Sequence, residues 1–128
     1  MTGILMFIRT LFLFLLPLLY LVATAGGVWA HARLLETIPP ANAVSAEPPT
    51  HVVLQFDSRV EKKVGASFSL VDPSGSVRSL AAGNVANEPG DRVSIPLPSL
   101  GSGDYRFEWS VISRDGHRVQ GSFSFSIE

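Results

Sequence analysis

Apolar and polar residues alternate along most of the chain from residue 52 onward, which is the pattern of β-strands that bury one face. Val52, Leu54 and Phe56 fall on one face of a first strand, and Phe68 and Leu70 fall on one face of the next. Val93 and Ile95 repeat the pattern around Ser94. No convincing run shows helical spacing, so the chain is predicted to be all-β.

The clearest alternation lies in segments 105–111 and 122–127, whose odd-numbered residues are apolar and whose even-numbered residues are polar. We expect these two segments to form the centre of a sandwich. Turn sequences rich in Pro, Gly and Asp occur at 72–75, 88–91 and 101–104. About seven short strands in about 100 residues predict an immunoglobulin-like or Greek-key β-sandwich.

Residues 1–30 have a different character, because 22 of them are apolar or aromatic and Arg9 is their single charge. The apolar centre at 11–22 follows this basic residue, and Val28-Trp29-Ala30 places small residues before a cut at His31. This is the layout of a secretory signal peptide. We therefore predict a cleaved leader at 1–30 and a single domain at 31–128.

An uncleaved membrane anchor is the alternative, since the 21 uncharged residues Thr10–Ala30 are long enough to span a bilayer. Pro17, Gly26 and Gly27 weigh against it. Export places the domain in the periplasm, where small domains often use disulfides. The chain has no cysteine, so its stability is expected to come from the core and from any bound ligand.

Charge gives no reason to expect a nucleic-acid partner, because ten basic residues stand against eleven acidic ones without a basic tail. After cleavage, no membrane-embedded segment is expected, and the domain is predicted to be a monomer.

Two of the three histidines suggest a metal site. Cleavage before His31 gives this residue a free α-amine, which with Nδ1 can chelate one ion in a six-membered ring. In Asp115-Gly116-His117, a carboxylate and an imidazole can converge on one ion if Gly116 lets the backbone turn. Together they offer three nitrogens and one oxygen, a set that suits tetragonal Cu(II) better than Zn(II).

The same segments resemble the CopC family of periplasmic copper-binding proteins. His31–Leu35 and Ile38–Ala43 look like the family's opening H-A-x-L and P-A-x-G/A segments, and Val52–Val60 continues the match. Tyr105–His117 looks like its Y-x-V-x-W-x-V-x-S-x-D-G-H block, and Gly121–Phe125 looks like its G-x-F-x-F strand. The resemblance covers residues 31–128.

The resemblance implies a cupredoxin-like or immunoglobulin-like Greek-key β-sandwich that binds one Cu(II) and acts in copper resistance or delivery, without catalysis. The family's ligands correspond to His31, Asp115 and His117. It also implies transfer to an inner-membrane copper transporter of the CopD type.

The chain departs from the family pattern in two ways. Some members carry a Cu(I) site rich in methionine, but Met1 and Met6, the only methionines, lie in the leader. Because Cu(I) prefers sulfur ligands, no separate Cu(I) site is expected. Arg118 stands where many relatives have Pro, and it could loosen the loop or add positive charge beside the metal.

The remaining polar residues are interpreted as structural. His51 is expected at a solvated strand edge, with a secondary metal contact as the alternative. Trp109 shares its face with Phe107 and Val111 and is assigned to the core. Arg59, Lys62 and Lys63 are expected in a solvated loop or strand edge, and Glu36 is a candidate hydrogen-bond partner of a ligand imidazole. The carboxylates of strand ends and turns are also assigned structural roles: Asp57, Asp72, Asp91 and Asp104.

Two other functions stay open from the sequence. An N-terminal histidine with a second histidine is also the copper site of lytic polysaccharide monooxygenases, which would make the protein a copper-dependent oxidative enzyme. A metal-free interaction module is expected if the leader is retained, because the α-amine of His31 then never forms.

Overall fold

Strands make up most of the chain that the computed structural model describes, namely residue 3, residues 31–83 and residues 88–128. The predicted leader at 1–30 lies outside the described residues, Gly3 apart. In chain order the strands are β1 (Leu34–Ile38), β2 (Val44–Ser45), β3 (His51–Phe56), β4 (Val60–Glu61), β5 (Ser67–Val71), β6 (Val77–Leu80), β7 (Arg92–Pro96), β8 (Gly103–Ser113) and β9 (Arg118–Ile127). Within this part of the chain, no helix is long and apolar enough to cross a membrane.

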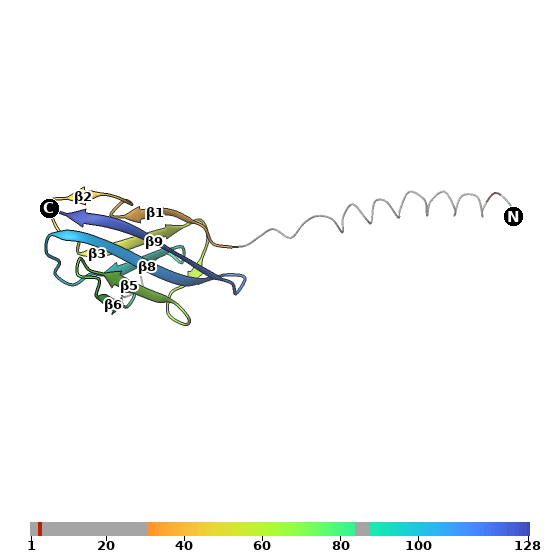
Figure 1. The fold of residues 1–128 in the computed structure, drawn as a ribbon. Helices are drawn as coiled ribbons and strands as arrows, with labels where there is room; N and C mark the ends of the chain where they lie inside the picture. The colour runs from red at the N-terminus through yellow and green to blue at the C-terminus, as the bar shows by residue number, and fades with distance from the viewer. Residues whose placement is uncertain (1–2, 4–30, 84–87) are drawn as a thin grey trace.

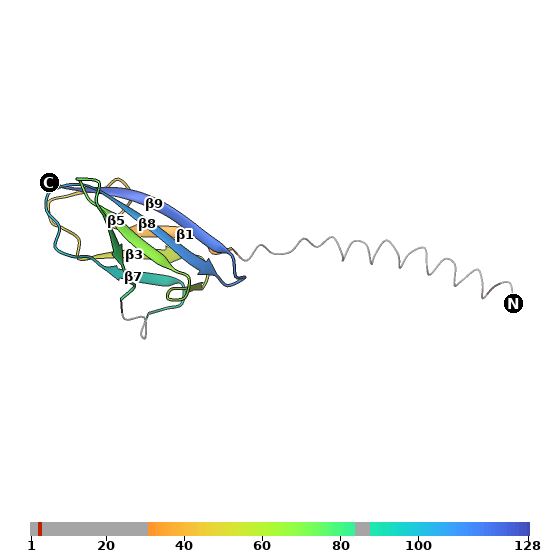
Figure 2. The ribbon, with the colours of Figure 1, turned by 60° about the horizontal axis from the view of Figure 1, so that its bottom comes forward.

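The strands form two sheets that pack face to face (Figures 1 and 2). The smaller sheet has the order β1-β3-β7, and the larger one has the order β2-β9-β8-β5-β6, with β4 added against β8. All pairings are antiparallel except that of β2 with β9. The predicted β-sandwich is therefore confirmed.

The hairpin of β8 and β9 is the longest pairing and runs from Gly103 opposite Ile127 to Ile112 opposite Arg118. Its odd-numbered residues from Tyr105 to Val111 are buried, as are those from Phe123 to Ile127. The hairpin holds the centre of the larger sheet, as the alternation at 105–111 and 122–127 predicts. Its turn lies at the end of the sandwich where residue 31 enters (Figure 1).

The core between the sheets consists of the side chains that alternation assigns to it. The larger fully buried ones are Phe56, Phe107, Leu54, Ile95, Val52, Val93 and Val111. Trp109 is also buried and meets Phe56 of the facing sheet edge to face, with ring centroids 5.4 Å apart. Such aromatic pairs stabilise the core beyond the area they bury.

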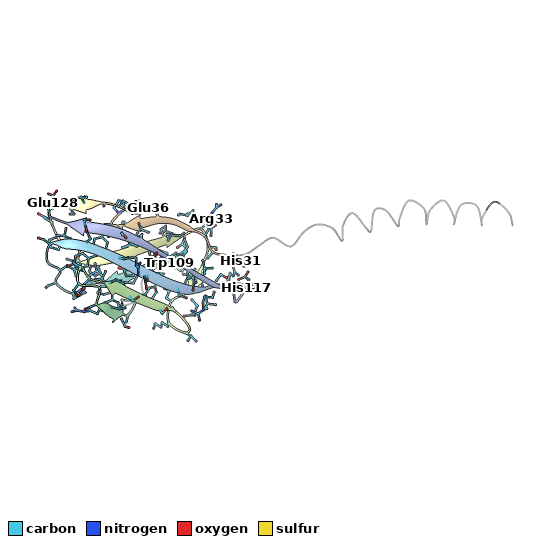
Figure 3. The ribbon with its side chains drawn as sticks, viewed as in Figure 1. His31, Arg33, Glu36, Trp109, His117 and Glu128 are labelled. Atoms are coloured by element: carbon cyan, nitrogen blue, oxygen red, sulfur yellow. The ribbon has the colours of Figure 1, made fainter. Side chains whose placement is uncertain are left out.

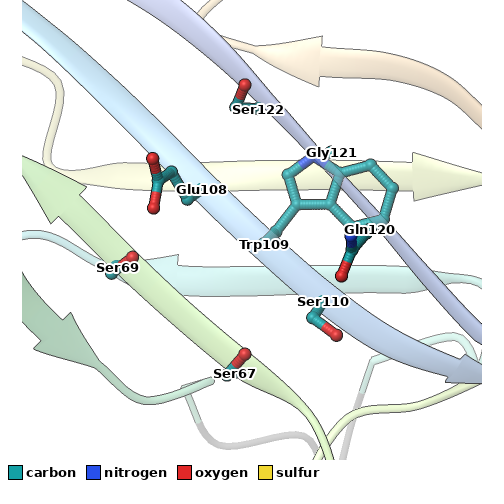
Figure 4. Close-up of a pocket in the computed structure, with 8 residues that line it drawn as sticks. All are labelled: Ser67, Ser69, Glu108, Trp109, Ser110, Gln120, Gly121 and Ser122. Carbon is teal, nitrogen blue, oxygen red and sulfur yellow. The ribbon is translucent and has the colours of Figure 1, made fainter.

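Gly121 makes room for Trp109. The two residues are opposite each other in the hairpin, and a Cβ built on Gly121 would lie 2.7 Å from Cζ2 of the indole. Figure 4 shows the indole beside this glycine, next to a polar hollow of about 460 Å³ on the outside of the larger sheet. The hollow is lined mainly by small side chains: Ser67, Ser69, Ser110 and Ser122, with Glu108 and Gln120.

One interpretation of the sequence is wrong. Lys62 is not solvated but is 8% exposed, and its Nζ donates to the carbonyl of Pro89 at 2.8 Å and lies 3.5 Å from Oε2 of Glu88. A lysine is buried only when its charge is paired and hydrogen-bonded, and Glu88 and Pro89 provide both. Arg59 and Lys63 are exposed, as expected.

Candidate metal centre

The turn between β8 and β9 brings Asp115 and His117 to one side. The amide of Ser113 donates to the carbonyl of His117 at 2.8 Å, and the amide of Gly116 donates to the carbonyl of Ser113 at 2.9 Å. Gly116 has φ of 84°, in the left-handed region that glycine adopts without strain. The glycine of the Asp-Gly-His motif therefore permits the turn, as the sequence predicts.

The two carboxylate oxygens of Asp115 have different roles. Oδ1 accepts hydrogen bonds from the hydroxyl of the buried Ser113 and from the amide of His117, the latter at 3.1 Å. Oδ2 lies 3.0 Å from Nδ1 of His31 and 3.0 Å from Nδ1 of His117. One oxygen thus fixes the carboxylate to the turn, and the other faces both imidazoles.

These contacts stabilise the ionised form of Asp115. The hydroxyl of Ser113 and then the side chain of His117 hold the pKa of Asp115 well below its ordinary value of 3.8. Hydrogen bonds donated to a carboxylate favour its charged form. The oxygen that faces the histidines therefore carries negative charge at any pH at which the imidazoles are neutral, which is the state a metal ligand needs.

His31 is placed by the residues that follow it. Ala32 is buried, and the backbone of Arg33 is fixed to Asp57 at the end of β3. Oδ1 of Asp57 accepts from the amide of Arg33 at 2.8 Å, and the amide of Asp57 donates to the carbonyl of Arg33 at 2.9 Å. Asp57 thus has the structural role expected of it, and that role orders the segment bearing His31.

The two imidazole rings lie face to face, with centroids 4.7 Å apart and planes 13° from parallel. Ligand atoms of His31, Asp115 and His117 all lie within 4.8 Å of one another. The three residues lie at the end of the sandwich, where Figure 3 shows His31 and His117 together; the two imidazoles are exposed, and the carboxylate of Asp115 is partly buried. A single ion at this end is within reach of all three residues.

The donor set fits copper better than it fits Mg²⁺ or Ca²⁺. Two imidazole nitrogens and a carboxylate oxygen come from the side chains, and the α-amine of His31 would add a third nitrogen once Ala30 is removed. Cu(II) favours such nitrogen and oxygen ligands in a tetragonal arrangement, whereas Mg²⁺ and Ca²⁺ favour oxygen alone.

The structure thus brings together the three residues named from the sequence, and it leaves others away from them. His51 begins β3 and pairs with Pro96, at the opposite end of that strand from Asp57, and its Nδ1 lies 3.0 Å from Oγ1 of Thr50. Glu36 lies on β1 and is not among the ligand atoms that converge.

The sequence did not single out Ser113, whose hydroxyl donates to Asp115, although Ser113 is the serine of the S-x-D-G-H segment. Arg118 is not seen to loosen the turn. Its guanidinium donates to the carbonyl of Gly65 at 3.0 Å and to Oγ of Ser110 at 2.6 Å, which ties the loop before β5 to the hairpin.

Comparisons with known proteins find similar sequences and a similar fold. The model of the CopC domain family matches residues 34–128. Protein YobA of Escherichia coli K12 is 33% identical over 104 residues, which cover 80% of this chain and 82% of YobA. Copper resistance protein C of Xanthomonas campestris pv. juglandis is 29% identical, covering 81% of this chain and 85% of that protein. The crystal structure of CopC from Methylosinus trichosporium OB3b superposes with a TM-score of 0.69 at 30% identity, covering 77% of this chain and 94% of that one.

Proposed function

Since the chain belongs to the CopC family, we propose that it is a periplasmic Cu(II)-binding protein that acts in copper resistance as a carrier or buffer. The single observation that carries the proposal is the convergence of Nδ1 of His31 and Nδ1 of His117 on Oδ2 of Asp115, each at 3.0 Å. Residues far apart in the sequence supply these atoms, so the arrangement is a product of the fold rather than of a local motif.

Copper is proposed to bind as Cu(II), one ion per chain. Residues 31–128 contain neither Met nor Cys, so the domain lacks the sulfur ligands that Cu(I) prefers. Imidazole nitrogens and a carboxylate oxygen suit the divalent ion. Among the described residues, one group of side chains has this geometry.

Cleavage before His31 is part of the proposal. In the uncleaved chain the nitrogen of His31 belongs to the peptide bond with Ala30 and cannot bind copper as an amine. Removal of residues 1–30 as a signal peptide frees that nitrogen beside Nδ1 of the same residue. Export and assembly of the ligand set are therefore one event, and the domain at 31–128 works outside the cytoplasm.

A role in binding rather than catalysis is supported by the position of the site. The three side chains lie at the exposed end of the sandwich, and none of them lines the polar hollow on the larger sheet. The charged oxygen of Asp115 faces both imidazoles, where an oxidative copper enzyme needs an open position for oxygen.

A membrane copper transporter of the CopD type is the proposed partner, and the carrier is proposed to act as a monomer.

Titration of the exported, purified protein with Cu(II), followed by electron paramagnetic resonance, tests this function. We expect one ion per chain and a tetragonal signal rich in nitrogen coupling. In the matched control the α-amine of His31 is acetylated, which keeps every side chain but removes that amine as a ligand. Failure to bind one ion, or an unchanged signal in the acetylated protein, would contradict the proposed site.

A further inference from the structure

Four exposed cations lie at the same end of the sandwich as the candidate metal centre: Arg59, Lys63, Arg114 and Arg118. Arg114 and Arg118 flank the Asp115-Gly116-His117 motif in the sequence. Arg59 and Lys63 flank β4, which pairs with the last residues of β8, Val60 opposite Ser113. We call these four residues the cationic collar. Within the described chain none of them makes an ion pair.

Most carboxylates at this end are engaged elsewhere. Asp57 accepts from the amide of Arg33 and lies 3.7 Å from its guanidinium, and Glu88 lies beside the buried Lys62. Oε1 of Glu61 accepts from the backbone amides that follow it, and Asp115 faces the histidines. These hydrogen bonds leave the negative charges of Glu61 and Asp115 in place, and Asp91 adds a third, whereas the exposed Arg92 beside it adds a further positive charge. Positive charge is therefore in excess at this end of the sandwich.

The loop between β4 and β5 presents an apolar tip beside the collar. Val64 is 79% exposed, the highest value among the large apolar side chains of the described residues. Its amide and that of Lys63 donate to Glu61 at 3.3 and 2.8 Å, and Arg118 holds the carbonyl of Gly65. The loop is thus fixed on both sides of its tip, and an exposed apolar side chain on an ordered loop is a feature of interaction surfaces.

The opposite end of the sandwich has the opposite charge. Glu128 lies there, as Figure 3 shows, and the turns at that end carry Glu47, Asp72 and Asp104. The domain is therefore polarised along its length, with the positive end at the metal centre. A cation collar repels a free hydrated Cu²⁺ ion, so the collar is not explained by capture of the ion alone.

Resting on the proposed function, we propose that the cationic collar and Val64 form the docking surface for an acidic face of a protein that exchanges copper with this one. Complementary charge steers such a partner to the site and orients it, and Val64 supplies an apolar contact beside the cationic collar. Copper then passes between proteins in contact rather than through solution.

Donor peptides of different charge test the collar directly. Each donor holds Cu(II) on the same iminodiacetate group and carries a tail of four glutamates, four serines or four lysines. At low salt we expect transfer to the exported apoprotein to be about tenfold faster from the glutamate donor than from the serine donor, and slowest from the lysine donor. The differences should vanish near 1 M salt, where screening acts within about 3 Å.

Matched variants show which residues cause the preference for the glutamate donor. Lys63→Glu should reduce the preference for the glutamate donor several-fold, whereas Arg78→Glu on β6, with the same change in net charge, should leave it intact. A leucine added beside the glutamate tail should speed transfer further, and Val64→Ser should remove that gain. Val77→Ser, which alters a valine of similar exposure on β6, is the control.

The outcomes separate the two proposals. Equal rates from all three donors, or equal loss in Lys63→Glu and Arg78→Glu, overturn the docking surface while leaving the metal site standing. Absence of copper uptake from every donor overturns the proposed function and the docking surface with it. Equal donor rates together with Lys63-dependent binding to phosphatidylglycerol vesicles also overturn the docking surface, because the cationic collar then binds an anionic membrane instead of a protein.

Discussion

The imidazoles of His31 and His117 stack with centroids 4.7 Å apart, although one precedes β1 and the other lies in the turn before β9. Both rings direct Nδ1 at the same oxygen of Asp115. An ion near that oxygen can therefore reach three ligands without rearrangement of the fold. Several expected outcomes depend on this arrangement.

Loss of either histidine should abolish tight copper binding. His31→Ala and His117→Ala should each lower the affinity for Cu(II) by more than the roughly 10- to 100-fold that follows loss of an outer hydrogen-bond partner. Competition titration against a chelator of known affinity measures this. His51→Ala is the control, because His51 lies at the far end of β3, and an equal loss there would argue against the assigned ligands.

Ser113 should position Asp115 rather than bind metal. Ser113→Ala removes the hydroxyl that holds Oδ1, so Asp115 can rotate and copper affinity should fall about 10- to 100-fold. Ser113→Thr keeps the hydroxyl and should restore most of the affinity. Ser110→Ala removes another buried serine hydroxyl, one bonded to Arg118, and should leave affinity within about twofold. Equal effects of the two alanine variants would argue against positioning.

Gly116 and Gly75 form a matched pair for testing the turn. Their φ angles are 84° and 85°, and a Cβ on either would meet no atom within 4 Å. Alanine at either position should therefore cost a similar unfolding free energy, about 1–2 kcal/mol, from backbone strain alone. Gly116→Ala should also weaken copper binding, whereas Gly75→Ala should not. Denaturant unfolding and copper titration of both variants decide this.

The acid stability of the copper-free protein should reflect Asp115. Because its pKa is lowered on folding, the ionised carboxylate stabilises the native state above its ordinary pKa near 3.8. That contribution is lost as the pH falls through the lowered value. The difference in Tm between the wild type and Asp115→Asn should therefore shrink as the pH falls below about 4. A difference that grows below that pH would contradict the assignment.

Alternation predicted the strands that bury one face. Val52, Leu54 and Phe56 in β3 are buried as expected, and so are the odd-numbered residues from Tyr105 to Val111 in β8 and from Phe123 to Ile127 in β9. β6 escaped prediction because its residues are mostly exposed and show no period of two. β2 and β4 have two residues each, too few to show any pattern, and exist because they pair with β9 and β8.

The grouping of His31 with Asp115 and His117 could be proposed from residue chemistry and from the family resemblance. The contacts that hold these three residues together could not be proposed from the sequence. The bonds from Asp57 to Arg33 and from Arg118 to Gly65 join segments that are distant in sequence, and no local spacing reveals them. The burial of Lys62 likewise depends on Glu88 and Pro89, which approach it only in the folded sandwich.

The distance along the chain between His31 and Asp115 has a consequence for turnover. An ion bound by both joins the first segment of the domain to its final hairpin, so it can be held only by a fully folded chain. Binding of this kind adds to stability in proportion to the logarithm of the free copper concentration. Copper-loaded molecules should therefore resist proteases that degrade copper-free ones, and the lifetime of the protein should rise and fall with the supply of the metal.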